Sequence, residues 1–173
     1  MTDSLTDEEM EMLIQVGLRR YDDCRKQNIY DDLQFDATPE EKKANDIWSC
    51  AAEYFFAKLS GLPWTGMPSS TTNAADVGSN IEVKSTKYFH KCHLIVRSNW
   101  RKKDPFEYIR NHIYVLIPYN KIERKFRYAG YMHGTDVMQD KYINSKEGNR
   151  ITWWVPEDVL IKELPNVDRA AAE

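Results

Sequence analysis

The spacing at which apolar residues recur along this chain changes near Pro63, and this change restricts the fold more than any other feature of the sequence. Before it, apolar residues recur at helical spacing. After it, short segments rich in β-branched and aromatic residues are separated by polar stretches. Helices followed by strands predict an α/β fold, or an α+β fold, with a central mixed β-sheet flanked by helices. A chain of 173 residues suits one domain, with helices over 7–60 and a sheet-rich core over 74–156.

Two capping boxes mark where the helices begin. Each box places a threonine three residues before a glutamate, so that the side chain of each bonds to the backbone N–H of the other. The pairs are Thr6 with Glu9 and Thr38 with Glu41. The first box predicts a helix over about 7–27. The second predicts a helix that ends at Ser60, because a glycine and a proline follow closely.

The second helix carries one carboxylate in an unusual place. From Ile47 to Leu59 this helix is apolar on nearly all sides, which predicts that it is buried. Glu53 lies in the middle of that stretch. A buried carboxylate is costly unless it is paired or bound to a metal. Glu53 is therefore a candidate functional residue.

Five segments after Pro63 predict strands. They are NIEVKST (80–86), CHLIVRS (92–98), HIYVLIPY (112–119), KFRYAGYMHG (125–134) and ITWWVP (151–156). Residues 104–111 predict a short helix or turn between two of these strands. The sequence PEDVLIKEL, which begins at Pro156, predicts a final short helix.

The stretch AADVGSNIEVKST, from Ala74 to Thr86, predicts a hairpin with its turn at 78–80. In this register Val77 faces Ile81 and Asp76 faces Glu82, and directly opposed residues share one face of a sheet. Three charged side chains then lie on one face and three apolar side chains on the other. The charged residues are Asp76, Glu82 and Lys84, and the apolar residues are Val77, Ile81 and Val83.

Two carboxylates and a lysine on one face suit a divalent cation. Carboxylates this close repel each other, and a cation removes the repulsion. Carboxylate oxygens are the ligands that Mg²⁺ prefers, and this ion also accepts phosphate oxygens from a substrate. A neighbouring lysine can orient or deprotonate the attacking water, or stabilise negative charge as it develops. The arrangement predicts hydrolysis of a phosphodiester.

A glutamate on a helix, then an aspartate, then Glu-x-Lys on the next strand resembles the PD-(D/E)XK nuclease superfamily, in particular its small phage-type members. The matching residues are Glu53, Asp76, Glu82, Val83 and Lys84. The resemblance implies a restriction-endonuclease-like core and a Mg²⁺-dependent nuclease acting on DNA, with Mn²⁺ able to substitute. Whether cleavage is endo- or exonucleolytic stays open. The sequence departs from the superfamily pattern in two ways: the loop between Asp76 and Glu82 is short, and no proline precedes Asp76.

The resemblance also implies a role for each matching residue. Asp76 and Glu82 bind the metal, and the backbone carbonyl of Val83 adds a ligand. Glu53 completes the metal shell directly or through water. Lys84 serves the attacking water.

The distribution of charge bears on the partner. Net charge is −3, but residues 47–150 hold 16 basic and 9 acidic residues, between acidic ends. A basic middle segment predicts a surface that binds the phosphates of a nucleic acid. A chance separation of basic and acidic residues on the solvated surface explains the distribution equally well. The basic segment near 97–103 is the candidate nucleic-acid-binding element. Its residues are Arg97, Trp100, Arg101, Lys102 and Lys103.

Other sites are disfavoured by the sequence. His90, Cys92 and His93 lie on a strand, where alternation separates their side chains, so zinc binding is not expected. Trp153 and Trp154 are expected in the core rather than as base-stacking platforms. Three scattered cysteines and no apolar run of membrane length predict a protein of the cytoplasm, in a bacterium or a phage-infected cell, without a membrane partner. A homodimer is left open.

Two rival functions remain. The first is a catalytically silent nuclease fold that binds only nucleic acid or a protein. The second is an interaction protein whose acidic N-terminal half binds protein, with Lys84 simply pairing a carboxylate across the hairpin. A response of protein stability to Mg²⁺ would separate the nuclease from both.

Overall fold

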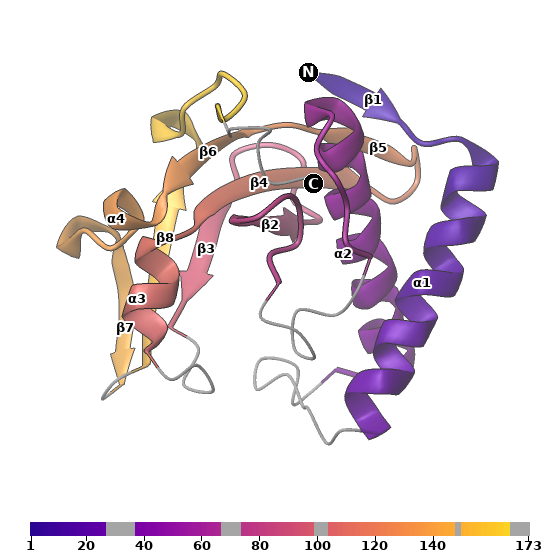
Figure 1. Cartoon of the computed structure of the whole chain (residues 1–173), viewed down its shortest axis with the longest axis horizontal. Coiled ribbons are helices and arrows are strands. Elements are labelled where there is room, and N and C mark those ends of the chain that lie inside the picture. The colour runs from indigo at the N-terminus through magenta and orange to yellow at the C-terminus, as the bar shows by residue number, and fades with distance from the viewer. Residues whose placement is uncertain (27–36, 67–73, 99–103, 148–149, 167–173) are drawn as a thin grey trace.

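The computed structural model describes residues 1–26, 37–66, 74–98, 104–147 and 150–166, and it shows a mixed α/β fold (Figure 1). Within these ranges the helices are α1 (Asp7–Lys26), α2 (Pro39–Ser60), α3 (Pro105–Arg110) and α4 (Gly134–Val137). The larger sheet contains β1 (Thr2–Ser4), β5 (Lys125–Arg127), β4 (Ile113–Asn120), β2 (Ile81–Thr86) and β6 (Gly130–His133). The smaller sheet contains β3 (His93–Arg97), β8 (Arg150–Pro156) and β7 (Ile143–Glu147).

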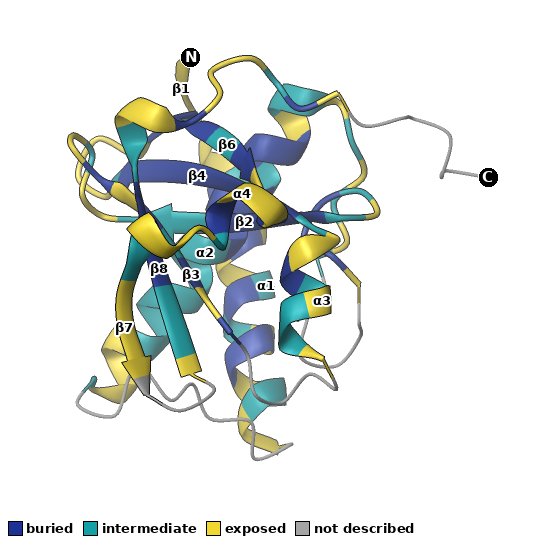
Figure 2. Cartoon of the chain, turned by 90° about the vertical axis from the view of Figure 1, so that its left-hand side faces the viewer, coloured by how far each residue is buried: buried dark blue, intermediate teal, exposed yellow. Residues whose placement is uncertain are grey.

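β4 organises the larger sheet. It pairs in parallel with β2 and antiparallel with β5 and β6, so this sheet is mixed. All residues of β4 but its last are buried, as Figure 2 shows. In Figure 1, α1 and α2 lie on one side of β2, whereas α3 and the smaller sheet lie on the other. β2 therefore lies between two walls of the molecule.

Both helices begin as their capping boxes predict. Thr6 N–H donates to Glu9 Oε2 at 2.8 Å, and the equivalent bond from Thr38 N–H to Glu41 Oε2 is also 2.8 Å. α2 ends at Ser60 and is capped by Gly61, which adopts the left-handed conformation (φ 69°) that glycine tolerates best. No helix in the described ranges combines the length and the apolar character needed to cross a bilayer.

Two apolar clusters hold the sheets in place. The first lies between α2 and the larger sheet, and it includes Phe55, Phe56, Val83 and Val115. The second lies between the smaller sheet and the opposite face of β4, and it includes Val96, Leu116 and Trp153. Because β4 contributes alternate residues to both clusters, it joins the two walls.

The strands differ from the prediction in three ways. First, they form two sheets rather than one central sheet. Second, KFRYAGYMHG is divided into β5 and β6, because the register of its pairing with β4 shifts between Phe126 and Gly130. Third, the sequence did not predict β1 and β7, which are short or largely exposed and so lack a hydrophobic alternation. The predicted final helix is only a 3₁₀ turn, η2 (Glu157–Val159), since Ile161 instead pairs with Tyr131.

Gly17 controls how closely α1 approaches α2. A Cβ atom at this position would lie 2.6 Å from the Ile47 Cα. Gly17→Ala should lower the free energy of unfolding, since overpacking costs about 1–3 kcal/mol whereas the gain in helix propensity is about 1 kcal/mol. Urea denaturation measures the change. Gln15→Ala, on the exposed face of α1, is the control, and equal stability of both variants would contradict the prediction.

Candidate functional site

The cleft between the two walls has a volume of about 460 Å³. It is lined by residues of α2, β2, β3 and β4 and by Asp76. The side chains and backbone that line it are Ser49, Glu53, Asp76, Glu82, Val83, Lys84, Ser85, Thr86, His93, Ile95, Arg97 and Leu116. The four residues predicted from the acidic and basic pattern, Glu53, Asp76, Glu82 and Lys84, therefore meet in one cleft.

Asp76 lies in the cleft, but it does not belong to a strand. It is held there by its neighbour Val77, which forms isolated β-bridges. Val77 pairs with Ile81, as the predicted hairpin register requires, but it also pairs with Trp64 on its other side. The prediction of a full first strand was therefore wrong, because Val77 is the only described residue just before the turn that pairs. Asp76 Oδ2 accepts a hydrogen bond of 2.9 Å from the Val83 N–H. This bond fixes the carboxylate against β2.

Glu82 and Lys84 project from β2 into the same cleft. Lys84 Nζ donates to Glu82 Oε2 at 3.0 Å, and Tyr108 Oη donates to Glu82 Oε1 at 2.6 Å. Tyr108 belongs to α3, so the opposite wall also orients this carboxylate. Tyr108 could not be predicted from a local pattern, because its partner lies 26 residues away. Both carboxylate oxygens keep a lone pair for a further ligand.

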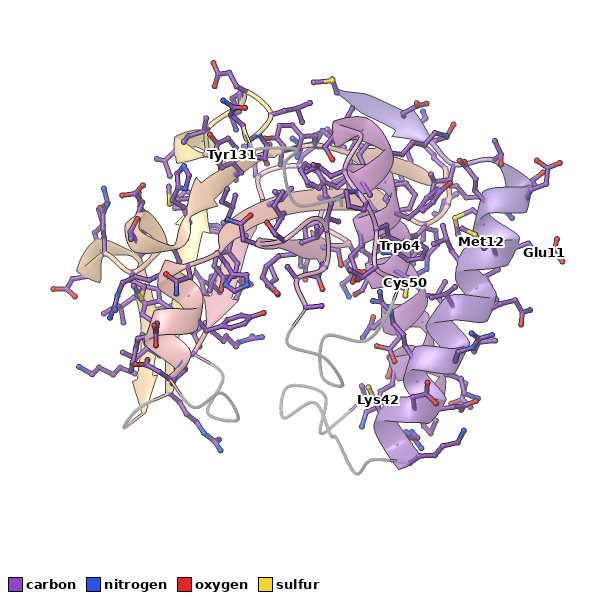
Figure 3. All side chains as sticks on the ribbon, in the orientation of Figure 1. Glu11, Met12, Lys42, Cys50, Trp64 and Tyr131 are labelled. Atoms are coloured by element: carbon purple, nitrogen blue, oxygen red, sulfur yellow. The ribbon has the colours of Figure 1, made fainter. Side chains whose placement is uncertain are left out.

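Glu53 forms a buried ion pair with Arg20 of α1. Arg20 Nη1 and Nη2 donate to the two carboxylate oxygens at 2.7 and 2.6 Å, and Trp64 Nε1 donates to Oε2 at 3.1 Å. Figure 3 shows Trp64 beside α2, on the same wall as Cys50. Arg20 was not among the residues predicted from the sequence. Its spacing of three residues from Gly17 places it on the buried face of α1, and that signal could have found it.

Asp76 and Glu82 do not ionise equally. Burial, together with the charges of Glu53 and Glu82, raises the pKa of Asp76 well above its usual range. Burial also opposes ionisation of Glu82, but the charge of Lys84 and the Tyr108 hydrogen bond hold its pKa below the usual value. Burial disfavours the charged form of Lys84 too, yet the charges of Glu82 and Asp76 raise the pKa of its ammonium. Lys84 is therefore a cation at neutral pH.

The donor set suits a cation that uses few protein ligands. Among the described residues, Asp76 forms no ion pair, while Glu53 and Glu82 are paired with Arg20 and Lys84. No three His, Cys, Asp or Glu side chains in the described part of the chain are arranged to hold a metal by themselves. Mg²⁺ usually binds through one or two carboxylates plus waters and substrate phosphate. Asp76 and Glu82 fit that requirement.

The candidate nucleic-acid-binding residues are only partly placed. Arg97, at the end of β3, lines the cleft. Trp100, Arg101, Lys102 and Lys103 lie outside the described residues. Trp153 is buried in the second apolar cluster, as predicted, but Trp154 is 40% exposed, so its predicted place in the core was wrong. Alternation along β8 explains the difference, because neighbouring residues of a strand face opposite sides.

Arg20→Met should destabilise the protein by about 3 kcal/mol, because it leaves the buried Glu53 carboxylate without its cation. The value lies at the low end for buried pairs, since Trp64 still donates to Glu53. Denaturant unfolding measures the loss, with the exposed neighbour Arg19→Met as the control. Adding Glu53→Gln to Arg20→Met should recover part of the stability. Equal effects of the two arginine variants would show that the pair contributes little.

Comparisons of the chain with models of protein families, with curated proteins and with solved structures found no match in any of the three.

Proposed function

We propose that the protein is a Mg²⁺-dependent nuclease that hydrolyses phosphodiester bonds of DNA. The observation that carries the proposal is Asp76, a buried carboxylate that faces the cleft beside two others and forms no ion pair among the described residues. Burying an uncompensated charge is costly, and a bound cation removes that cost. The mixed sheet with α2 packed against it is proposed to be the restriction-endonuclease-like core that the sequence resemblance implies.

Each residue of the cleft has a proposed role. Asp76 and Glu82 hold Mg²⁺, with the Val83 backbone carbonyl as a further ligand and Mn²⁺ as an alternative ion. Glu53 acts through water, because Arg20 and Trp64 already occupy its oxygens. When bound, the ion supplies Lewis-acid polarisation of the phosphodiester and activation of the attacking water.

Lys84 and the basic side chains act on the substrate itself. The raised pKa of Lys84 keeps it protonated, so it stabilises developing negative charge and orients the attacking water rather than accepting a proton. Arg97, on the β3 side of the cleft, holds the DNA backbone. Arg101, Lys102, Lys103 and Trp100 remain predicted contacts to the nucleic acid.

The test uses the purified full chain and labelled single-stranded, duplex and branched DNA. Cleavage is expected with Mg²⁺ or Mn²⁺ and is expected to be absent in EDTA. Melting curves over a Mg²⁺ titration should show a rising midpoint, since a ligand that binds only the folded state stabilises it. A protein with no Mg²⁺ response and no cleavage of any substrate would refute the proposal and favour a fold that only binds nucleic acid or protein.

A further inference from the structure

The smaller sheet extends one wall of the cleft beyond the carboxylates. His93, Ile95 and Arg97 of β3 line the cleft, whereas Leu94 and Val96 between them point into the second apolar cluster. The face of β3 opposite that cluster is thus the face that lines the cleft. Any residue of β8 on that same face continues the wall.

Trp154 is such a residue. It lies directly opposite Ile95 in the antiparallel pairing of β3 and β8, and opposed residues share a face. Its neighbours Trp153 and Val155 point the other way and are buried. Neighbouring strands lie about 4.8 Å apart, so the Trp154 backbone is one strand spacing from a residue that lines the cleft.

Trp154 also has the surface that a stacking platform needs. The residue is 40% exposed, and its ring lies 5.8 Å from the His93 ring at an interplanar angle of 47°. Trp154 is not itself part of the cleft lining, but it lies beside two residues that are, His93 and Ile95. A large aromatic side chain left partly in water next to a polar cleft is stabilised when a ligand covers its ring. Arg97 and Lys84 line the cleft and provide positive charge for the phosphates next to a stacked base.

We propose that Trp154 forms a subsite for one unpaired nucleobase of a DNA strand whose phosphate lies in the cleft. This inference rests on the proposed function and narrows its substrate class. Only a base outside a double helix exposes its face for stacking on a side chain. The preferred substrate is therefore a single strand, a flap or a frayed end rather than an intact duplex.

Binding in EDTA tests the subsite without cleavage. Fluorescence anisotropy of a labelled single strand of about 12 thymidines, a length within known site sizes, gives the affinity. Trp154→Ala should weaken binding about 5- to 100-fold, the range expected for loss of one stacked base, while Trp154→Phe should retain most of the affinity. Binding to a duplex of the same length should change less than about 2-fold, because a paired base offers no free face. Tyr88→Ala, at a residue that is 66% exposed and lies on neither β3 nor β8, is the matched control and should leave both affinities unchanged.

A second measurement identifies the contact itself. A single abasic nucleotide is moved along the strand, and one position should weaken binding to the unaltered protein. An abasic nucleotide at the same position should have no effect on binding by Trp154→Ala, because loss of the base and loss of the indole remove the same interaction. A loss of affinity that is equal for strand and duplex, or an abasic effect that persists in Trp154→Ala, would overturn the subsite.

The outcomes separate this inference from the proposed function. Binding that depends on Trp154 in a protein that cleaves nothing would leave the subsite standing and refute the nuclease. Metal-dependent cleavage by the unaltered protein, together with unchanged binding by Trp154→Ala, would support the nuclease and refute the subsite.

Discussion

Lys84→Ala is expected to lower the single-turnover cleavage rate about 1,000-fold or more while leaving Mg²⁺ binding as strong as in the unaltered protein, or stronger. A charge that stabilises the transition state is worth several kcal/mol, and each 1.36 kcal/mol is tenfold in rate. Removal of the ammonium also frees Glu82 Oε2, which in the unaltered protein accepts a hydrogen bond from Lys84 Nζ. The loss should therefore appear in turnover and not in metal affinity.

Glu82→Ala provides the contrast. It removes a carboxylate from the proposed metal site, so calorimetric titration should show weaker binding of Mg²⁺ or Mn²⁺ in addition to the loss of cleavage. Lys87→Ala, an exposed lysine just beyond β2, is the control for loss of positive charge and should cleave at the normal rate. If Lys84→Ala cleaves normally, or if both active-site variants bind metal normally, the assigned roles are wrong.

Asp76→Asn is expected to abolish cleavage, again by about 1,000-fold or more, and at the same time to stabilise the metal-free protein. The asparagine side-chain oxygen can still accept the hydrogen bond from the Val83 N–H, so the local geometry is kept. What is lost is a buried negative charge whose ionisation is opposed by burial and by the charges of Glu53 and Glu82.

The gain in stability should depend on pH. An acid whose pKa is raised by folding stabilises the folded state while it is protonated, and this stability is lost as pH rises through the folded-state pKa. Below the usual aspartate value of 3.8, Asp76 is protonated in both states and the variant should match the unaltered protein. Above the raised pKa the variant should be the more stable. Thermal unfolding in EDTA across this range measures the difference.

Two results would contradict this prediction. One is an Asp76→Asn variant that is less stable than the unaltered protein at neutral pH in EDTA, which would mean that another group already compensates the carboxylate. The other is a variant whose melting point still rises with Mg²⁺ as in the unaltered protein. Asp136→Asn, an exposed aspartate of α4, is the control for the chemical change alone.

The local features of the fold could be predicted from the sequence because neighbouring residues determine them. The capping boxes located the starts of α1 and α2. The two-residue period of a strand placed Glu82 and Lys84 on one face of β2, and the turn at 78–80 placed Val77 opposite Ile81. Each of these features depends on contacts within a few positions of the chain, where spacing and residue type are sufficient.

The tertiary structure decided what surrounds the charged cluster. Arg20 pairs with Glu53 across 33 positions, and Tyr108 reaches Glu82 across 26. Neither contact follows from a local period, because each depends on how α1 and α3 pack against the rest of the molecule. The same is true of Trp154. Its strand period showed only that it and Trp153 face opposite sides, and the packing of the smaller sheet against β4 determined which of the two is buried.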